Sequence, residues 1–221
     1  SAGSGSLESD DLFQGVTPTQ WAQVQVVSVS TVRSEGARQA LATVISGYTG
    51  APVRFFWTRA SHGELVCAYS DPSTMGADRW HALVAAWDLV GGACVVVDAG
   101  SAITIDWIDS RGHHLGGYIL PGRNMMSVSL RQSTARVLFD EQDAQGTSPG
   151  RSTSECVHHG VNWMMQALAR QLGQDLEVPV LITGGDGALI ESAMANSRDR
   201  IPEVLLRPDL VLDGLALMET I

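Results

Sequence analysis

The chain has 221 residues, of which 44% are hydrophobic, so it is long enough to bury a sizeable core in one large domain or two small ones. Its 14 Lys and Arg residues against 24 Asp and Glu residues give a net charge of −10, which argues against nucleic acid or an anionic membrane as the main partner. All 14 cationic residues are arginine, so phosphate groups must be met by arginine, backbone amides or a metal ion.

The cysteines and the lack of long apolar runs favour a cytoplasmic protein. Cys67, Cys94 and Cys156 are odd in number and far apart, which favours reduced thiols over a disulfide framework. No apolar run reaches the roughly 18 residues of a membrane span, and the chain does not open with a basic region followed by an apolar one. The run Ser1 to Ser6 is either a loop or a remnant of cloning.

Predicted strands and helices alternate along the chain, which is typical of the α/β class. In the first part we expect a strand over Val24 to Val29, a helix after Ser34, a strand over Val53 to Thr58, and a loop over Ser61 to Met75. A helix should then run from near Asp78 to Gly91-Gly92, with Trp80, Leu83, Val84 and Trp87 on one apolar face.

The second part should open with a buried strand over Ala93 to Val97. A half-exposed alternating strand over Ile103 to Ile108 and a hairpin partner over His114 to Leu120 follow, and Pro121 is expected to begin a helix. Ser152 to Glu155 has the form of a capping box that starts a long amphipathic helix. The last predicted elements are a strand over Val178 to Thr183, a helix over Ala188 to Asn196, a strand over Glu203 to Leu206 and a helix over Asp209 to Met218.

The stretch Asp98 to Ala102 follows the predicted buried strand and combines a carboxylate with a tight turn. A strand that ends in this way puts the carboxylate at the open edge of a sheet, where ligands bind. Gly100 lets backbone amides approach an anion, Ser101 adds a hydroxyl, and Asp98 can hold a cation that accompanies a phosphate. The alternative is a strand followed by an ordinary turn.

A second candidate site lies where the long predicted loop enters a helix. Gly76 permits a close backbone approach, Asp78 can accept a proton, and Arg79 can pair with a carboxylate or a phosphate. This combination suits transfer of a group to a hydroxyl. The alternative is that Asp78 only caps its helix and that Arg79 is a solvated charge.

Further glycine-rich segments and paired histidines leave their roles open. For Gly116 to Gly122, close packing is favoured over a phosphate approach. Gly184 to Gly187, after a buried strand, offers amides to an adenosine or its phosphates, or serves only as a turn. The pairs His113-His114 and His158-His159 lack the spacing of a closed zinc site. The six tryptophans fall mostly on predicted apolar faces and are expected in the core.

Five motifs occur in order over about 120 residues. They are Tyr-x-x-Pro-x-x-Met-Gly-x-Asp-Arg (Tyr69 to Arg79), Asp-x-Gly-Ser-Ala (Asp98 to Ala102), Gly-Gly-x-Ile-x-Pro-Gly (Gly116 to Gly122), Gly-Arg-Ser-Thr (Gly150 to Thr153) and Thr-Gly-Gly-Asp (Thr183 to Asp186). Together they resemble the type III pantothenate kinases, which are related to the Bvg accessory factor. The resemblance implies two ribonuclease-H-like halves of the actin and acetate-and-sugar-kinase type, with the site in the cleft between them, in a homodimer. Residues 1–92 would form the first half, without its leading strand or strands, and residues 93–221 the second.

The resemblance also implies a reaction, namely ATP-dependent phosphorylation of pantothenate, the first step of coenzyme A biosynthesis, with Mg²⁺ and a monovalent cation, K⁺ or NH₄⁺. Asp78 resembles the general base that takes the proton from the primary hydroxyl of pantothenate, and Asp98 resembles the ligand of the monovalent cation. Ser101 stands where the family usually has a threonine that contacts ATP. The residues that resemble pantothenate contacts are Tyr69, Gly76, Ala77, Asp78, Arg79 and Thr153.

One departure from the family pattern supports an alternative function. The family opens with Asp-x-Gly-Asn-Thr and a nearby lysine, which hold the ATP phosphates and Mg²⁺, and this sequence contains neither. Either the displayed chain starts after that segment, or the protein has lost it. A catalytically silent relative that regulates or binds is therefore the alternative to an enzyme. A different sugar or acetate kinase of the same fold is a weaker alternative, because the Tyr69 to Arg79 motif is particular to the pantothenate kinases.

Overall fold

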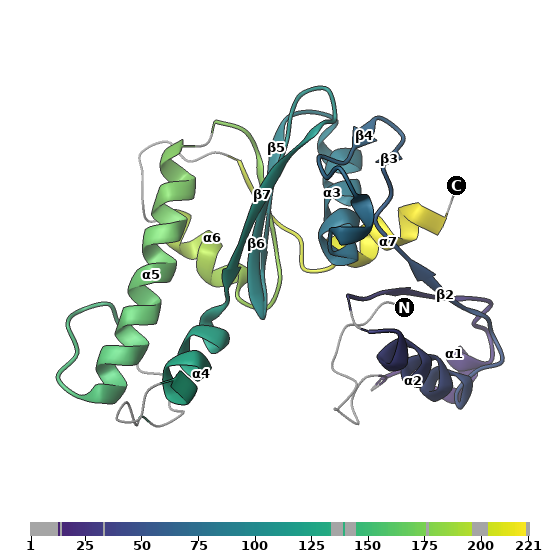
Figure 1. Ribbon diagram of the computed structural model, residues 1–221, viewed down its shortest axis with the longest axis horizontal. Helices are drawn as coiled ribbons and strands as arrows, with labels where there is room; N and C mark the ends of the chain where they lie inside the picture. Colours follow the sequence, from purple (N-terminus) through teal and green to yellow (C-terminus); the bar gives the residue numbers. More distant parts are fainter. Residues whose placement is uncertain are drawn as a thin grey trace. The chain divides into compact units, whose positions relative to one another are not determined.

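The computed structural model describes residues 13, 15–32, 34–133, 139, 145–175, 177–195 and 203–219 (Figure 1). The chain divides into two compact units: unit 1 comprises Ser1–Gly91, Arg111–His114 and Asp209–Ile221, and unit 2 comprises Gly92–Ser110 and Leu115–Pro208. The two units differ from the sequence-based halves in that Arg111–His114 and Asp209–Ile221 belong with the first. Asp209–Ile221 belongs to unit 1 because the C-terminal helix packs on a helix of unit 1. Within the described part of the chain, no helix is long and apolar enough to span a membrane.

Unit 1 combines short strands with helices. Its elements are α1 (Pro18–Trp21), β1 (Val27–Ser30), α2 (Glu35–Ser46), β2 (Val53–Phe56), β3 (Ser61–His62), β4 (Leu65–Val66), the 3₁₀ helix η1 (Pro72–Thr74), α3 (Ala77–Val90) and α7 (Leu210–Glu219). β1 and β2 pair in parallel, and β3 and β4 pair antiparallel. The predicted loop over Ser61 to Met75 is therefore partly regular, and its elements are too short to produce a periodic sequence signal.

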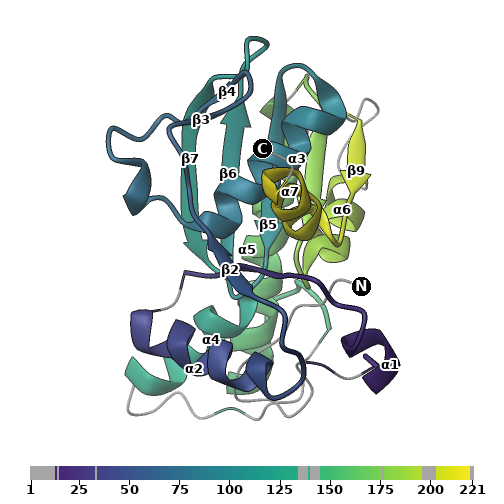
Figure 2. The ribbon, with the colours of Figure 1, turned by 90° about the vertical axis from the view of Figure 1, so that its right-hand side faces the viewer.

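Helix α3 forms the core of unit 1. Nine of its 14 residues are buried, so the helix is enclosed on more than the single apolar face predicted from the sequence. It ends as predicted at Gly91, which adopts a left-handed conformation with φ of 58°. Helix α7 packs beside α3 (Figures 1 and 2). Where they meet, the backbone of Gly214 lies so close to the carbonyl oxygen of His81 that a Cβ atom would overlap it.

Unit 2 contains a five-stranded mixed sheet. Its elements are β5 (Cys94–Ala99), β6 (Ala102–Ile108), β7 (His114–Pro121), α4 (Arg123–Ser133), α5 (Thr153–Asp175), β8 (Val180–Thr183), α6 (Gly187–Ala195) and β9 (Val204–Leu206). The strand order is β7-β6-β5-β8-β9, with β5 antiparallel to β6 and parallel to β8, and β8 parallel to β9. Because β5 and β8 run in parallel, their carboxyl ends reach the same edge of the sheet, where Asp98 lies opposite Thr183.

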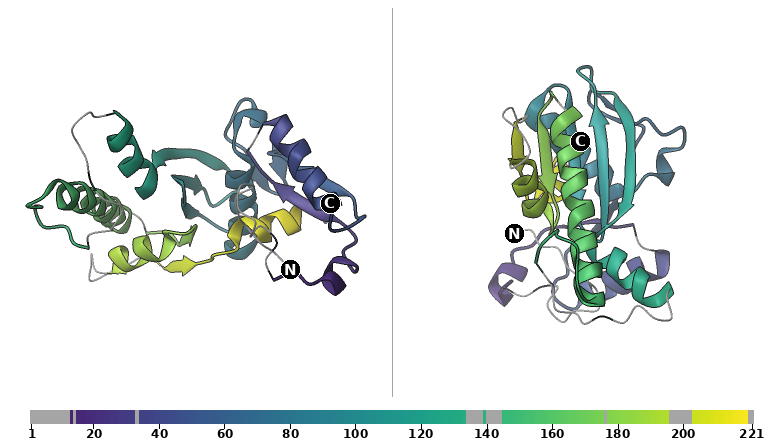
Figure 3. Two further views of the ribbon diagram at one scale, coloured as in Figure 1. Left: turned by 90° about the horizontal axis from the view of Figure 1, so that it is seen from below. Right: turned by 90° about the vertical axis from the view of Figure 1, so that its left-hand side faces the viewer.

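Helices α5 and α6 cover one face of this sheet (Figure 3). The apolar side chains of both helices pack with inward residues of β5, β6 and β8; examples are Met165, Leu172, Ile190, Val97 and Ile182. Strands and helices alternate as predicted, and the α/β class is confirmed.

Two local predictions in unit 2 are wrong. Pro121 ends β7 instead of beginning a helix, and α4 starts at Arg123. In the alternating strand predicted over Ile103 to Ile108, Asp106 falls on the exposed side, but in the structure it is only 1% exposed. The reason is that β7 covers it: a Cβ atom at Gly117 would overlap the Asp106 carboxylate. Packing, the favoured role for the Gly116 to Gly122 segment, is thus observed at Gly117.

Expectations about the core hold for some large residues and fail for others. Trp21 and Trp80 are buried, but Trp57 and Trp163 are 44% and 61% exposed.

The thiol of Cys94 is buried, and this burial raises its pKa to about 12, so it stays protonated at neutral pH.

The contact between α3 and α7 leads to a stability prediction. Gly214→Ala should lower the free energy of unfolding by about 1–3 kcal/mol, because the added methyl group overlaps a backbone carbonyl that cannot rotate away. Gly160→Ala in α5 is the matched control, because no atom lies within 4 Å of a Cβ atom there. It should raise stability by about 0.5–1 kcal/mol. Urea unfolding of both variants measures the difference, and equal stabilities would contradict the packing account.

Candidate functional site

Asp78 and Arg79 are the second and third residues of α3, whose N-cap residue is Gly76. The Oδ1 atom of Asp78 accepts a hydrogen bond from the Arg79 backbone N–H at 2.8 Å, and it lies 2.6 Å from where a Cβ atom of Gly76 would be. The carboxylate therefore folds over the positive end of the helix, where its charge is stabilised. Asp78 does cap its helix, but with one oxygen: among the described residues none donates to Oδ2.

Tyr69 and Arg79 are brought into direct contact. The Arg79 Nη1 atom donates a hydrogen bond to the Tyr69 hydroxyl at 3.0 Å, and the guanidinium carbon lies 5.8 Å from the centroid of the Tyr69 ring. Arg79 is only 5% exposed, so it is not the solvated charge that the sequence left open. Ala77 is buried as well, at 4% exposed.

The segment before α3 is held by short-range hydrogen bonds. Asp71 caps η1 and accepts hydrogen bonds from the backbone and the hydroxyl of Ser73 at 3.0 and 2.7 Å. These bonds favour the ionised carboxylate and lower the pKa of Asp71. The Thr58 hydroxyl, just after β2, donates to the Met75 carbonyl at 3.0 Å. The approach to Gly76 is therefore anchored at both ends.

His81 lies one turn further along α3 and is fully buried. Its Nδ1 atom is 2.8 Å from the hydroxyl of Ser30 on β1, while its Nε2 atom is buried without a hydrogen-bond partner among the described residues. Burial, together with the positive charge of Arg59, lowers the pKa of His81 to about 4. His81 is therefore neutral at pH 7 and ties α3 to β1.

In unit 2, the turn after β5 and the turn after β8 pack together around Asp98. A Cβ atom at Gly184, which has φ of 87°, would lie 2.5 Å from Asp98 Oδ1 and 2.6 Å from the Ala99 backbone. The backbone N–H of Asp186 donates to the Ala99 carbonyl at 2.8 Å. Two of the five sequence motifs are thus joined, because only a glycine at position 184 allows this approach.

The Gly116 to Gly122 motif, at the end of β7, also contacts the turn after β5. The backbone N–H of Gly122 donates to the Ser101 carbonyl at 3.0 Å. A Cβ atom at Gly122 would overlap the carbonyl oxygens of Gly100 and Ser101. The next residue, Arg123, lies 3.6 Å from Asp186 Oδ1 through its Nη1 atom. Arg123 is not among the site residues predicted from the sequence, although its place directly after the Pro-Gly turn is a signal that the sequence offers.

Thr153 lies in the first turn of α5 and is exposed. The capping box predicted there is present in a shifted form: Ser152 Oγ accepts a hydrogen bond from the Glu155 N–H at 3.1 Å, and the Glu155 carboxylate accepts one from the Arg151 N–H at 2.6 Å. None of the hydrogen bonds between described residues involves the Thr153 side chain, so its hydroxyl is available to a ligand.

The oxygen atoms around Asp98 fit a hard cation only in combination with other ligands. Among the described residues, no group of three or more His, Cys, Asp and Glu side chains is placed to hold a metal ion. A cation at the half-buried Asp98 would therefore take its other ligands from backbone carbonyls, water or substrate phosphates. That is the usual arrangement for a cation bound together with a nucleotide.

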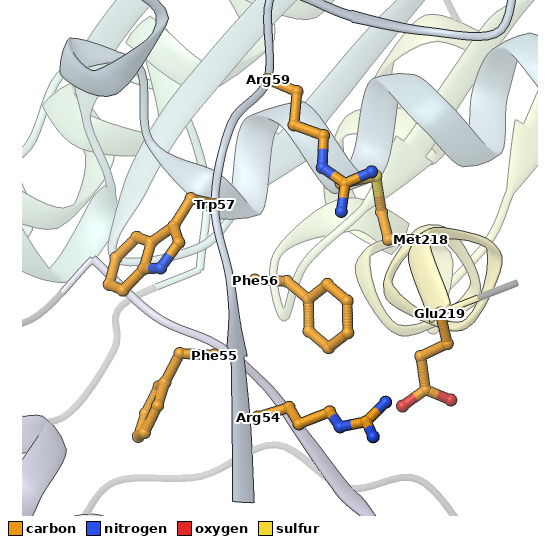
Figure 4. Close-up of a pocket in the computed structure, with 7 residues that line it drawn as sticks. All are labelled: Arg54, Phe55, Phe56, Trp57, Arg59, Met218 and Glu219. Atoms are coloured by element: carbon orange, nitrogen blue, oxygen red, sulfur yellow. The ribbon is translucent and has the colours of Figure 1, made fainter. Parts of the chain in front are cut away.

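The structure also contains open hollows outside the predicted site. One of about 590 Å³ in unit 1 is lined by Arg54, Phe55, Phe56, Trp57, Arg59, Met218 and Glu219. Figure 4 shows Phe56 and the two arginines directed toward α7, with Phe55 and Trp57 on the other side of β2. A second hollow, of about 260 Å³, lies in unit 2 beside Trp107 and Tyr118. Neither hollow is lined by a predicted site residue. The candidate site is therefore identified by the kinds of side chain it contains and not by the shape of the surface.

Comparison with known proteins gives consistent matches over most of the chain. The sequence model of the family described as type III pantothenate kinase matches residues 4–175. A type III pantothenate kinase of Marinobacter nauticus is 39% identical over 199 residues, which cover 88% of this chain and 79% of the relative. Enzymes with the same name from Ectopseudomonas mendocina and Pseudomonas aeruginosa are 35% and 36% identical, covering 96% and 98% of this chain and 87% and 89% of the relatives.

One solved structure supports the fold. A protein from Campylobacter jejuni described as a Baf family transcriptional activator aligns with a TM-score of 0.53 at 24% identity, covering 89% of this chain and 83% of its own. At this identity the similarity concerns the fold alone.

The neutral state of His81 leads to a prediction about pH. Its pKa is lower in the folded protein than the ordinary value of 6.5, so the unfolded chain takes up the proton first as pH falls. The stability associated with this group is complete above pH 6.5 and falls by about 3 kcal/mol on going to pH 4. His81→Asn, which keeps a polar atom near Ser30, should lose less stability between pH 7 and pH 4 than the parent does.

Urea unfolding at pH 7, 5.5 and 4 measures this effect. His113→Asn, a change at an exposed histidine, is the control and should retain the pH dependence of the parent. If His81→Asn and the parent lose stability equally as pH falls, burial of His81 does not govern the acid response.

Proposed function

This chain belongs to the type III pantothenate kinase family, and on that basis we propose that it transfers the γ-phosphoryl group of ATP to the primary hydroxyl of pantothenate, the first step of coenzyme A biosynthesis. The observation that carries the proposal is the family match over residues 4–175, which includes four of the five sequence motifs. The local geometry supports it, because the reaction needs a positioned carboxylate and charge-stabilising groups, and little covalent chemistry from the protein. The alternative of a catalytically silent relative predicts binding without turnover.

Asp78 is the proposed general base. Its Oδ1 atom is occupied by the Arg79 amide, so Oδ2 is the atom that takes the proton from the pantothenate hydroxyl. As this O–H bond breaks, the alcohol oxygen forms a bond to the γ-phosphorus, and the bond from that phosphorus to the leaving ADP oxygen breaks. The buried helix α3 supports this role, because it holds the carboxylate on a rigid element.

The groups next to Asp78 are proposed to bind pantothenate. Arg79 carries a positive charge that suits the pantothenate carboxylate, and Tyr69 holds its guanidinium through the 3.0 Å hydrogen bond. Gly76 and Ala77 offer backbone groups at the start of α3. Thr153 is proposed to add a hydroxyl contact from the start of α5.

ATP is proposed to bind at the carboxyl ends of β5 and β8, with Ser101 as a contact. Asp98 is proposed to hold a monovalent cation, K⁺ or NH₄⁺. Mg²⁺ would enter with the nucleotide and offset the negative charge of its phosphates. The close turns at Gly122 and Gly184 keep side chains away from this edge, which supports a site for phosphates.

We also propose that the protein works as a cytoplasmic homodimer. Large apolar side chains remain exposed on unit 2, and their burial against a second copy would be favourable. They are Leu115, Tyr118 and Ile119 on β7, Met125 and Leu130 on α4, and Trp163 and Met164 on α5.

Replacement of the proposed base tests the reaction. Asp78→Asn should lower kcat by about 10²–10⁴-fold, because the amide keeps the helix cap but cannot take a proton. Asp88→Asn, at an exposed position of the same helix, is the control and should retain turnover. A coupled assay of ADP release with pantothenate, ATP, Mg²⁺ and K⁺ measures both. Near-normal turnover of Asp78→Asn would exclude it as the base.

The parent protein in the same assay separates the kinase from the silent relative. ADP release that depends on pantothenate supports the kinase. Release no faster than without enzyme, from protein shown to be folded by circular dichroism, would instead favour a regulatory or binding function.

The cation proposed at Asp98 leads to a further prediction. Replacing K⁺ by Na⁺ at constant ionic strength should reduce turnover, because the larger ion suits a site of mixed carboxylate and backbone oxygens. In Asp98→Asn the K⁺ concentration for half-maximal turnover should rise by at least about tenfold. Initial rates over a K⁺ titration measure this, and indifference of the parent to the ion would remove the proposed role.

A further inference from the structure

The segment Arg111–His114 joins β6 to β7 in the sequence but packs within unit 1. The Gly112 carbonyl accepts a hydrogen bond from the backbone N–H of Val66 at 2.9 Å. A Cβ atom at Gly112 would lie 2.6 Å from the Glu64 carbonyl oxygen and 3.1 Å from the Trp87 ring, and its φ of 83° also favours glycine. Backbone contacts therefore hold this segment against the β3–β4 hairpin and α3.

The last residue of the segment, His114, is 3% exposed and lies beside Tyr69. The two rings are nearly parallel, at 12°, and their centroids are 6.2 Å apart. This is within the range of offset aromatic stacking. The His114 Nδ1 atom also accepts a hydrogen bond from the Ala68 backbone N–H at 3.4 Å, directly before Tyr69. His114 thus contacts both the ring and the backbone at this point.

Tyr69 needs such support because it lies between β4 and η1, outside any helix or strand. Its hydroxyl accepts the hydrogen bond from Arg79 at 3.0 Å, so the orientation of the ring decides where the guanidinium is held. The contacts run from His114 through Tyr69 to Arg79, and the two ends of this chain, His114 and Arg79, are both buried.

We propose that His114 is a positioning residue for the pantothenate-binding groups. It holds the Tyr69 ring by stacking, and Tyr69 in turn holds the Arg79 guanidinium toward the substrate carboxylate. This inference rests on the proposed function, because it assigns the purpose of the arrangement. Ordering these side chains before the substrate arrives lowers the entropy cost of binding, so the expected effect is on substrate affinity.

Three variants separate the two contacts of His114. His114→Phe keeps a ring to stack on Tyr69 but loses the acceptor for the Ala68 amide. His114→Asn keeps an acceptor near the position of Nδ1 but loses the ring, and His114→Ala loses both. His113→Ala is the matched control, because the neighbouring histidine is exposed. Circular dichroism and urea unfolding establish which variants are folded.

Steady-state kinetics give the first readout. His114→Ala and His114→Asn should raise KM for pantothenate by about tenfold, with kcat and KM for ATP changed by less than about twofold. His114→Phe and His113→Ala should stay close to the parent. If His114→Asn keeps the low KM while His114→Phe loses it, stacking is not the positioning contact and the proposal is overturned. A fall in kcat with unchanged KM would overturn it as well.

A double-mutant cycle tests whether His114 acts through Tyr69. In a Tyr69→Ala background, His114→Ala should produce no further rise in KM for pantothenate, because the ring that it positions is already absent. Independent, multiplying effects of the two changes would show that His114 does not act through Tyr69.

A measurement without substrate separates this inference from the proposed function. The chain has three tyrosines, so the spectrum of protein with ¹³C-labelled tyrosine rings contains few signals. Tyr69→Phe assigns the Tyr69 signal, which should shift in His114→Ala and His114→Asn and stay close to its parent position in His113→Ala. An unmoved Tyr69 signal overturns the positioning role even if the parent phosphorylates pantothenate. If the signal shifts but the parent lacks kinase activity, the contact between His114 and Tyr69 is supported and the proposed function is contradicted.

Discussion

The burial of α3 is the constraint on which the proposed catalytic residues depend. The helix is enclosed by α7, which approaches through Gly214, and it is tied to β1 through the contact between His81 and Ser30. A helix held in this way cannot rotate or slide without opening the core of unit 1. Asp78 and Arg79 in its first turn therefore take their positions from packing that lies several residues away from them.

In unit 2, close approaches between backbone segments fix the position of the turn after β5. Gly184 and Gly122 each lie so close to the turn after β5 that a side chain at either position would collide with it. These contacts bring segments far apart in the sequence to one edge of the sheet, around Asp98. Close packing thus explains the glycines at positions 122 and 184, and the edge of the sheet beside them is where the proposed nucleotide site lies.

Much of the fold could be predicted from local patterns. The helix after Ser34 has apolar residues at helical spacing, the helix that ends at Gly91 has a glycine C-cap, and the strand that leads to Asp98 is a continuous apolar run. The prediction failed where the signal was short or came from outside the element. β3 and β4 have two residues each, which is too few for a pattern, and the burial of Asp106 depends on the glycine of a neighbouring strand.

The sequence by itself determined the α/β class, the family and the candidate site residues, because these follow from periodicity along the chain and from motifs of fixed spacing. Only the tertiary structure decided that Arg79 is buried against Tyr69, that His114 stacks on the same ring, and that α7 belongs with α3. The physical reason is that these contacts join residues 10, 45 or more than 100 positions apart. A local sequence pattern cannot indicate contacts between residues so far apart in the chain, because these contacts form only when the chain packs.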